Sequence, residues 1–379
     1  MPSSPNDEKE PELPLPPRRE TFLARYPRHL KIGAVAALLV VAVLIFSLSD
    51  HKVVRTGPAT TPIAVAIHGQ DAKAALGNPS LTTNAFQIAR SAGSDASAVP
   101  VTTTAGGSDV AENENVFMTP APDPNLSEDT PQGSLPRVGE DGRQPWQAYA
   151  RPFNTADKRP RVSIVVVDLG LSRVASDAAI DRLPPNVTLA FDVQSPVVGA
   201  WCARARQAGH ETLLMVPMEP FDYPRSDPGP NTLLSNLPNS DNLQRLQWAL
   251  RQGTGYVGIT TLSGSRFTTD PDKIKPILEE LRRRGLMIFD ARVAPHSAIA
   301  DLAHDAHVAV AVETQRIDQN LAPAAIDMAL NQLEQTARLT GHAVGMAAPL
   351  PVVLDRLGPW IKQLRQDGVA LAPLSAMTQ

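Results

Sequence analysis

The chain has 379 residues, a formal net charge of −4 at pH 7 and a single cysteine, Cys202. One cysteine excludes an internal disulfide and any metal site built from several thiolates, and the small negative charge argues against nucleic acid as a partner. Apolar residues make up 42% of the chain and charged residues 20%, as in ordinary globular proteins. However, the 36 prolines and the aromatic content of only 4% indicate that part of the chain lies outside any core.

An uncharged apolar run, Ile32–Leu48, is the first strong element. It reaches the length of roughly 17 residues at which a helix can cross a bilayer. Basic residues are more frequent before the run than after it, which predicts that residues 1–31 form a cytoplasmic tail. A cleaved secretory signal is the alternative, but the preceding segment is long and no small-residue cleavage motif follows. We therefore expect residues 32–48 to be a single-pass transmembrane anchor.

Residues 49–159 are rich in Pro, Ala, Ser and Thr. Such a composition offers too little apolar surface to offset the entropy lost on ordering, about 1 to 2 kcal/mol per residue. We therefore expect a disordered linker between the anchor and the folded part of the chain.

Residues 160–379 alternate short apolar runs with amphipathic helical windows, which predicts one α/β domain. Repeated strand–helix units imply parallel strands. Seven or eight units favour a β/α barrel over an open, doubly wound sheet. Local signals mark three helix ends: Asp270 before Pro271 and Asp241 as caps at helix starts, and Gly285 at a helix end. The expected strands begin near residues 161, 187, 211, 256, 286, 307, 342 and 369, and the expected helices cover residues 172–183, 196–208, 242–252, 271–284, 297–306, 324–340 and 352–366.

Polar residues follow several of the predicted strands, where parallel α/β folds collect their chemistry. Acidic groups at these strand ends suit a site for a hard cation or an acid–base pair. The alternative is structural: an Asp at a strand end often caps the next helix, and Asp290 with Arg292 often closes a barrel rim. The candidates in chain order are Asp168, Glu219, Ser265, Arg266, Asp290, Arg292, Glu313, Arg316 and Asp318.

At these positions the sequence resembles the divergent polysaccharide deacetylase family, a branch of the NodB-like carbohydrate esterases. The resemblance lies in VVVDLGLS, AGHETLLMVPMEP, DPGPNTLL, GITTLSGSRFTTD and FDARV, which begin at Val165, Ala208, Asp227, Gly258 and Phe289. It implies an irregular NodB-like barrel, a place in the cell envelope and zinc-assisted removal of acetyl groups from amino sugars. On this basis the catalytic candidates are Asp168, Glu219, Asp290 and Arg292, and the substrate-binding candidates are Ser265, Arg266 and Asp318.

The departures from the family pattern concern its metal site. Only Asp168 remains as a metal candidate, because Val167 stands where the pattern has a first acid and Met215, Leu262 and Met346 stand where it has histidines. A hydrolytic zinc needs about three protein ligands, and a thioether is too soft for that role. We therefore expect that zinc is not retained and that hydrolytic activity is doubtful. A replacement site for a hard cation, built from Asp168, Glu219, Asp290 and Asp318, stays open.

The sequence thus predicts an inner-membrane protein with a periplasmic C-terminal domain that acts in the metabolism of cell-wall amino-sugar polymers. The alternative is a non-catalytic barrel that binds glycan or protein and serves as a periplasmic scaffold. Expected partners are an envelope glycan or peptidoglycan, and the inner membrane through Ile32–Leu48.

Overall fold

The computed structural model describes residues 117–378. The predicted anchor at 32–48 lies outside this range, as does the linker up to residue 116. Within residues 117–378, no helix combines the length and the apolar character needed to cross a membrane.

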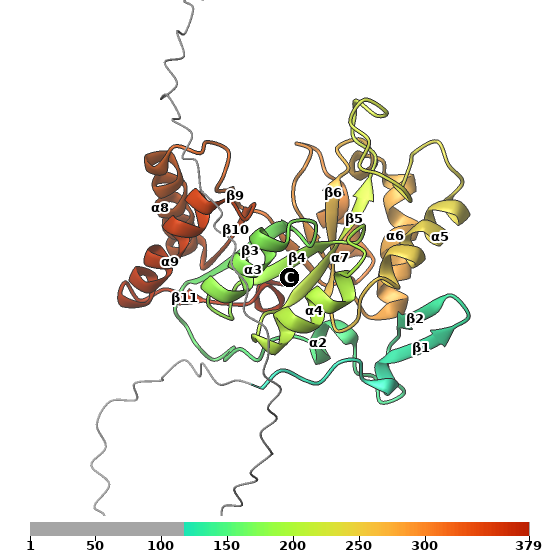
Figure 1. The fold of residues 1–379 in the computed structure, drawn as a ribbon, viewed down its shortest axis with the longest axis horizontal. Helices are drawn as coiled ribbons and strands as arrows, with labels where there is room; N and C mark the ends of the chain where they lie inside the picture. Colours follow the sequence, from blue (N-terminus) through green and yellow to red (C-terminus); the bar gives the residue numbers. More distant parts are fainter. Residues whose placement is uncertain (1–116, 379) are drawn as a thin grey trace, which may run out of the picture. The chain divides into compact units, whose positions relative to one another are not determined.

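A curved parallel sheet organises the α/β part of the molecule (Figure 1). Its strands are adjacent in the order β8-β7-β6-β5-β4-β3-β10-β9, and β11 pairs with the start of β3. The sheet is a parallel half-barrel, which confirms the predicted parallel α/β fold and, in part, the irregular barrel of seven or eight strand–helix units. The strands are β3 (Arg161–Leu169), β4 (Thr188–Asp192), β5 (Thr212–Met218), β6 (Gly258–Ser263), β7 (Met287–Asp290), β8 (Val310–Val312), β9 (Gln315–Arg316), β10 (His342–Ala347) and β11 (Ala370–Leu371).

The two edge strands, β8 and β9, are consecutive in the chain, and only Glu313 and Thr314 separate them. The Glu313 N–H donates to the carbonyl of Asp290 at the end of β7, at 2.9 Å. The Thr314 N–H donates to the carbonyl of Val344 in β10, at 2.8 Å. This short connection therefore bonds to β7 and β10, the strands next to the two edges of the sheet.

The helices follow the predicted pattern, with their ends displaced by a few residues. Figure 1 shows α5 and α6 side by side next to β5 and β6, and α8 and α9 together beside β10. The helices are α3 (Arg173–Arg182), α4 (Val198–Gln207), α5 (Asn239–Leu250), α6 (Pro271–Arg284), α7 (Ile299–Asp305), α8 (Pro323–Thr340) and α9 (Pro351–Gln366); the chain ends in the 3-10 helix η4 (Leu374–Met377), and η3 (Phe267–Thr269) precedes α6.

The caps of two helices test the local signals. Asp270 caps α6 by accepting a hydrogen bond from the Asp272 N–H at 3.1 Å, and Gly285 ends that helix at φ 63°. Both predictions are confirmed. The predicted cap at Asp241 is wrong, because α5 begins at Asn239 and Asp241 lies in its first turn.

Side chains alternate between the two faces of the sheet, as the period of a strand requires. In β5, Leu214 and Val216 face the layer of helices, whereas Leu213 and Met215 belong to a second apolar cluster on the concave side. This interior cluster also contains Val165, Val167, Phe289 and Met346. The concave side of the half-barrel is thus filled with apolar side chains.

Residues 117–159 contain ordered structure, which corrects the predicted end of the linker. They form η2 (Pro124–Leu126), a hairpin of β1 (Ser127–Thr130) and β2 (Gly133–Pro136), and α2 (Pro145–Ala148). The buried Arg206 of α4 donates to the carbonyls of Thr119 at 2.6 Å and Tyr149 at 2.9 Å. We call residues 117–159 the strap, because hydrogen bonds fasten it to the α/β unit.

Candidate functional site

A residue with left-handed backbone geometry lies at or near the carboxyl end of three strands of the sheet. Asp168 in β3 has φ 58°, Ser263 in β6 has φ 60°, and Arg292 just after β7 has φ 43°. Non-glycine residues rarely adopt this geometry, which costs energy and gathers at functional sites. The carboxyl end of the sheet is therefore the first place to look for chemistry, as the sequence predicts.

Asp168 is exposed at this end of the sheet. Its backbone N–H donates to the Met215 sulfur at 3.1 Å. Partial desolvation raises the pKa of Asp168, the Arg316 guanidinium opposes that rise, and the Asp318 carboxyl adds to it. Arg316 also pairs with Asp318, with 2.8 Å between Nε and Oδ1. Asp168 and Asp318, both predicted as site residues, are thus electrostatically coupled through one arginine.

Asp290 ends β7 and is buried. Its Oδ1 accepts hydrogen bonds from the Arg292 backbone N–H at 3.0 Å and the Ser297 hydroxyl at 3.1 Å. Burial raises the pKa of Asp290, and these two hydrogen bonds counteract it. The predicted Asp290–Arg292 contact is therefore present, but it is made by the Arg292 backbone while the residue itself is exposed.

Glu313, noted in the sequence but not chosen as a principal candidate, is the most perturbed carboxyl of this end. It is only 8% exposed, and its Oε1 has no hydrogen-bond partner. Burial raises its pKa to about 7; Arg316 and Arg292 oppose the rise, and Asp318 and Asp290 reinforce it. Its position directly after an apolar strand is the sequence feature that points to Glu313 as a site residue.

Asp192, at the end of β4, was missed by the sequence reasoning. It is buried and accepts a hydrogen bond from the Gln194 N–H at 2.8 Å. Burial raises its pKa, and the nearby Asp168 carboxyl raises it further. Asp192 therefore belongs to the same set of charges as Asp168.

Glu219, Ser265 and Arg266 make a separate set of contacts at the ends of β5 and β6. Glu219 accepts a hydrogen bond from the Ser235 N–H at 2.6 Å, and its Oε1 lies 3.5 Å from Nε of Arg266. The Ser265 hydroxyl accepts from the Phe221 N–H at 3.0 Å. These bonds hold loops together, so Glu219 is engaged in structure rather than joined to the charges around Asp168.

The residues present do not fit the zinc ion that the resemblance implies. Met215 and Met346 are buried in the interior cluster, and Leu262 packs against it. Zinc requires nitrogen, thiolate or carboxylate ligands, and Asp168 is the one such group at the predicted ligand positions. Nor do three histidine, cysteine or acidic side chains come close enough to hold a metal ion anywhere in residues 117–378.

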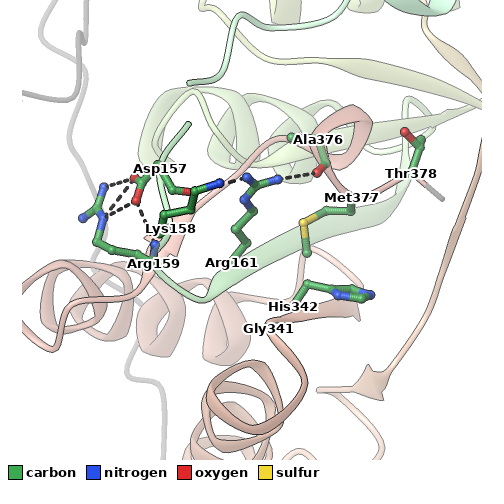
Figure 2. Close-up of a pocket in the computed structure, with 9 residues that line it drawn as sticks. All are labelled: Asp157, Lys158, Arg159, Arg161, Gly341, His342, Ala376, Met377 and Thr378. Atoms are coloured by element: carbon green, nitrogen blue, oxygen red, sulfur yellow. Dashed lines mark hydrogen bonds and ion pairs between the residues drawn. The ribbon is translucent and has the colours of Figure 1, made fainter. Parts of the chain in front are cut away.

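A cavity of about 310 Å³ lies at the opposite end of the sheet, beside the first residues of β3 and β10. Figure 2 shows Arg161 reaching between residues 157–158 and Ala376. Its guanidinium donates to the carbonyls of Thr155 at 3.0 Å and Ala376 at 3.5 Å. Arg161 thereby fastens the strap and the C-terminal segment to the sheet. We therefore interpret this cavity as a gap between packed segments of the chain rather than as a binding site.

Comparison with known proteins agrees with the resemblance. The family model described as "Divergent polysaccharide deacetylase" matches residues 164–378. The Escherichia coli K12 protein YibQ, named uncharacterized, is 24% identical over 208 residues, which are 55% of this chain and 64% of that protein. An uncharacterized Haemophilus influenzae protein is 23% identical over 55% of this chain and 73% of its own length.

A solved structure extends the comparison to the fold. The crystal structure of the uncharacterized protein ATU2773 from Agrobacterium tumefaciens C58 is similar with a TM-score of 0.63. The two sequences are 34% identical, over 64% of this chain and 99% of that chain. The likeness thus covers essentially the whole of that protein, and in this chain it is confined to about two-thirds of the length.

Proposed function

Because the chain belongs to the divergent polysaccharide deacetylase family but carries apolar side chains where a hydrolytic metal needs donors, we propose that it binds an envelope glycan without hydrolysing it. The burial of Met215 and Met346 in the interior cluster carries this proposal. To hold zinc there, the half-barrel would need imidazoles in a region now packed with carbon and sulfur.

The polar groups at the carboxyl end of the sheet support binding of a sugar. Carboxyl groups accept hydrogen bonds from hydroxyls, and the exposed guanidiniums of Arg266 and Arg292 can donate to them. The Phe221 ring is 57% exposed in the loop after β5 and offers a flat apolar surface for the face of a sugar ring. We expect the glycan to belong to the amino-sugar polymers of the cell wall.

We further propose that Ile32–Leu48 anchors the chain in the inner membrane and that residues 117–378 work in the periplasm. The uncharged run with basic residues before it supports this orientation. The segment between the anchor and the strap would then let the domain reach the glycan layer from the membrane surface.

Acetate release and glycan binding separate this proposal from a deacetylase. Full-length protein in mild detergent, supplied with Zn²⁺ and N-acetylglucosamine oligomers, should release no acetate above a protein-free control. The same preparation should bind amino-sugar oligomers in calorimetry. Sustained turnover that is abolished by Asp168→Ala would overturn the proposal and restore the deacetylase reading.

A further inference from the structure

Glu313 differs from the other buried glutamates of residues 117–378. Glu211 accepts from the Ser375 hydroxyl, Glu219 from the Ser235 N–H, and Glu280 from the Arg284 guanidinium. Only Glu313 among these four keeps a buried oxygen, Oε1, without a hydrogen-bond partner. An unpaired buried carboxyl is costly, and proteins rarely retain one without a use. The missing partner points to a ligand.

The position of Glu313 directs its side chain to the concave side of the sheet. Ala311 belongs to the interior cluster, and the next residue, Val312, packs against the layer of helices. Since side chains alternate along an extended segment, Glu313 faces the same side as Ala311. Its carboxyl therefore lies at the carboxyl end of the sheet on the interior side, near the apolar cluster that replaces the predicted zinc site.

The charges around Glu313 favour a cation as that ligand. Two guanidiniums, those of Arg292 and Arg316, face the three carboxyls of Asp290, Glu313 and Asp318. The groups that act on the charge of Glu313 are Asp290 and Arg292 from the β7 side, and Arg316 and Asp318 from β9 and the loop after it. A neutral ligand leaves the excess of carboxyls uncompensated, whereas a cation removes it.

The spacing of the acidic groups selects the kind of cation. Within residues 117–378 no three of them converge closely enough to hold a metal ion. An organic ammonium group differs from a metal ion because one close carboxyl can act as its counter-ion, while its other N–H groups can donate to water.

We propose that Glu313 is the counter-ion for a protonated amine, and that this site takes the free amino group of a de-N-acetylated amino sugar. The assignment rests on the proposed function, because it names the sugar that the glycan site prefers. An acetamido group is neutral and bulkier, so the N-acetylated sugar gains no ion pair with Glu313. The protein would then recognise the product of deacetylation rather than its substrate.

Calorimetry on the full-length protein tests this assignment with three ligands at pH 6: glucosamine oligomers, N-acetylglucosamine oligomers and ethanolamine. We expect the glucosamine oligomers to bind at least tenfold more tightly than the acetylated ones. Since the carboxyl pKa of about 7 leaves Glu313 mostly protonated at pH 6, binding should release about 0.9 proton per site, measured in buffers of different ionisation enthalpy. Ethanolamine, the amine of a lipid headgroup, should bind far more weakly.

The variant Glu313→Gln should lose at least tenfold in affinity for glucosamine oligomers and release no proton. The matched variant Glu279→Gln removes an exposed carboxyl of α6 and should behave as wild type. Equal affinity for acetylated and free oligomers, or an unchanged preference in Glu313→Gln, would overturn the assignment and leave glycan binding intact. Equal binding of ethanolamine would overturn the choice of a sugar. Binding of neither oligomer would refute the proposed function itself. Proton release by wild type decides the question even where the variant folds poorly.

Discussion

Replacing Glu313 with glutamine tests the electrostatics of the site through stability alone. The folded protein raises the pKa of this carboxyl from its usual 4.5 to about 7, chiefly through burial. The folded state thus holds the proton more tightly than the unfolded chain does. The contribution of Glu313 to stability is therefore fully present below about pH 4.5 and is lost as the pH rises through 7.

The size of the effect follows from the two pKa values. Each pKa unit corresponds to about 1.36 kcal/mol, so ionising Glu313 in the folded protein costs about 3 kcal/mol. Glutamine has nearly the same shape and stays neutral. The stability of Glu313→Gln relative to wild type should therefore increase by about 2.5 kcal/mol between pH 5 and pH 8.

Urea unfolding of full-length wild type and Glu313→Gln at pH 5, 6, 7 and 8 measures this difference. Other carboxyls with raised pKa values that do not interact with Glu313, such as Asp168 and Asp192, change the stability of both proteins alike and cancel in the comparison. Glu279→Gln serves as the control and should show a constant offset from wild type at every pH. A difference between Glu313→Gln and wild type that does not grow with pH would refute the burial of an ionisable Glu313.

Three further predictions concern the strap, the sheet and the interior cluster. Arg206→Ala should destabilise the protein by about 3 kcal/mol in urea unfolding and speed proteolysis within the strap, because it removes a buried, charged donor; unchanged cleavage would contradict this. Gly258→Ala should cost about 2 kcal/mol, since its Cβ would lie 2.1 Å from the Met287 carbonyl oxygen; a neutral result in the same assay would show that β6 and β7 can separate. The triple variant Met215→His, Leu262→His and Met346→His should gain about one zinc ion per chain by elemental analysis, and no gain would show that the three positions do not converge beside Asp168.

The strands and helices of the α/β unit could be predicted because their signals are local. Alternation, apolar runs and caps such as Asp270 act within a few residues. The strap could not be found in this way. Few of its side chains are buried, among them Leu126, Leu135 and Tyr149, and it is fastened by distant donors such as Arg206. The few apolar residues of the strap hardly change the average composition of residues 49–159. That composition therefore resembles a linker.

The candidate site was predictable only in part for a similar reason. An Asp that ends an apolar run, as Asp168 and Asp290 do, can be assigned to the carboxyl end of a parallel sheet from the sequence. The sequence does not show that Glu219 is occupied by the Ser235 N–H, because that bond depends on how the loop after β5 folds back. Residue type and strand position thus locate the carboxyls, and the tertiary structure decides which are engaged.

Glu211 and Glu313 show most clearly that strand position does not reveal whether a carboxyl has a partner. Both flank an apolar strand, and both are buried. Glu211 accepts from the Arg151 N–H, 60 residues away, and from the Ser375 N–H, 164 residues away, so the chain itself supplies its partners. For Glu313 no segment within residues 117–378 arrives to donate to Oε1. Missing histidines can be read position by position in a sequence, but a missing donor is a property of the whole fold. Since a buried carboxyl without a donor is costly, the open Oε1 favours a ligand as the partner of Glu313, and the carboxyls of Asp290 and Asp318 near it favour a positively charged one.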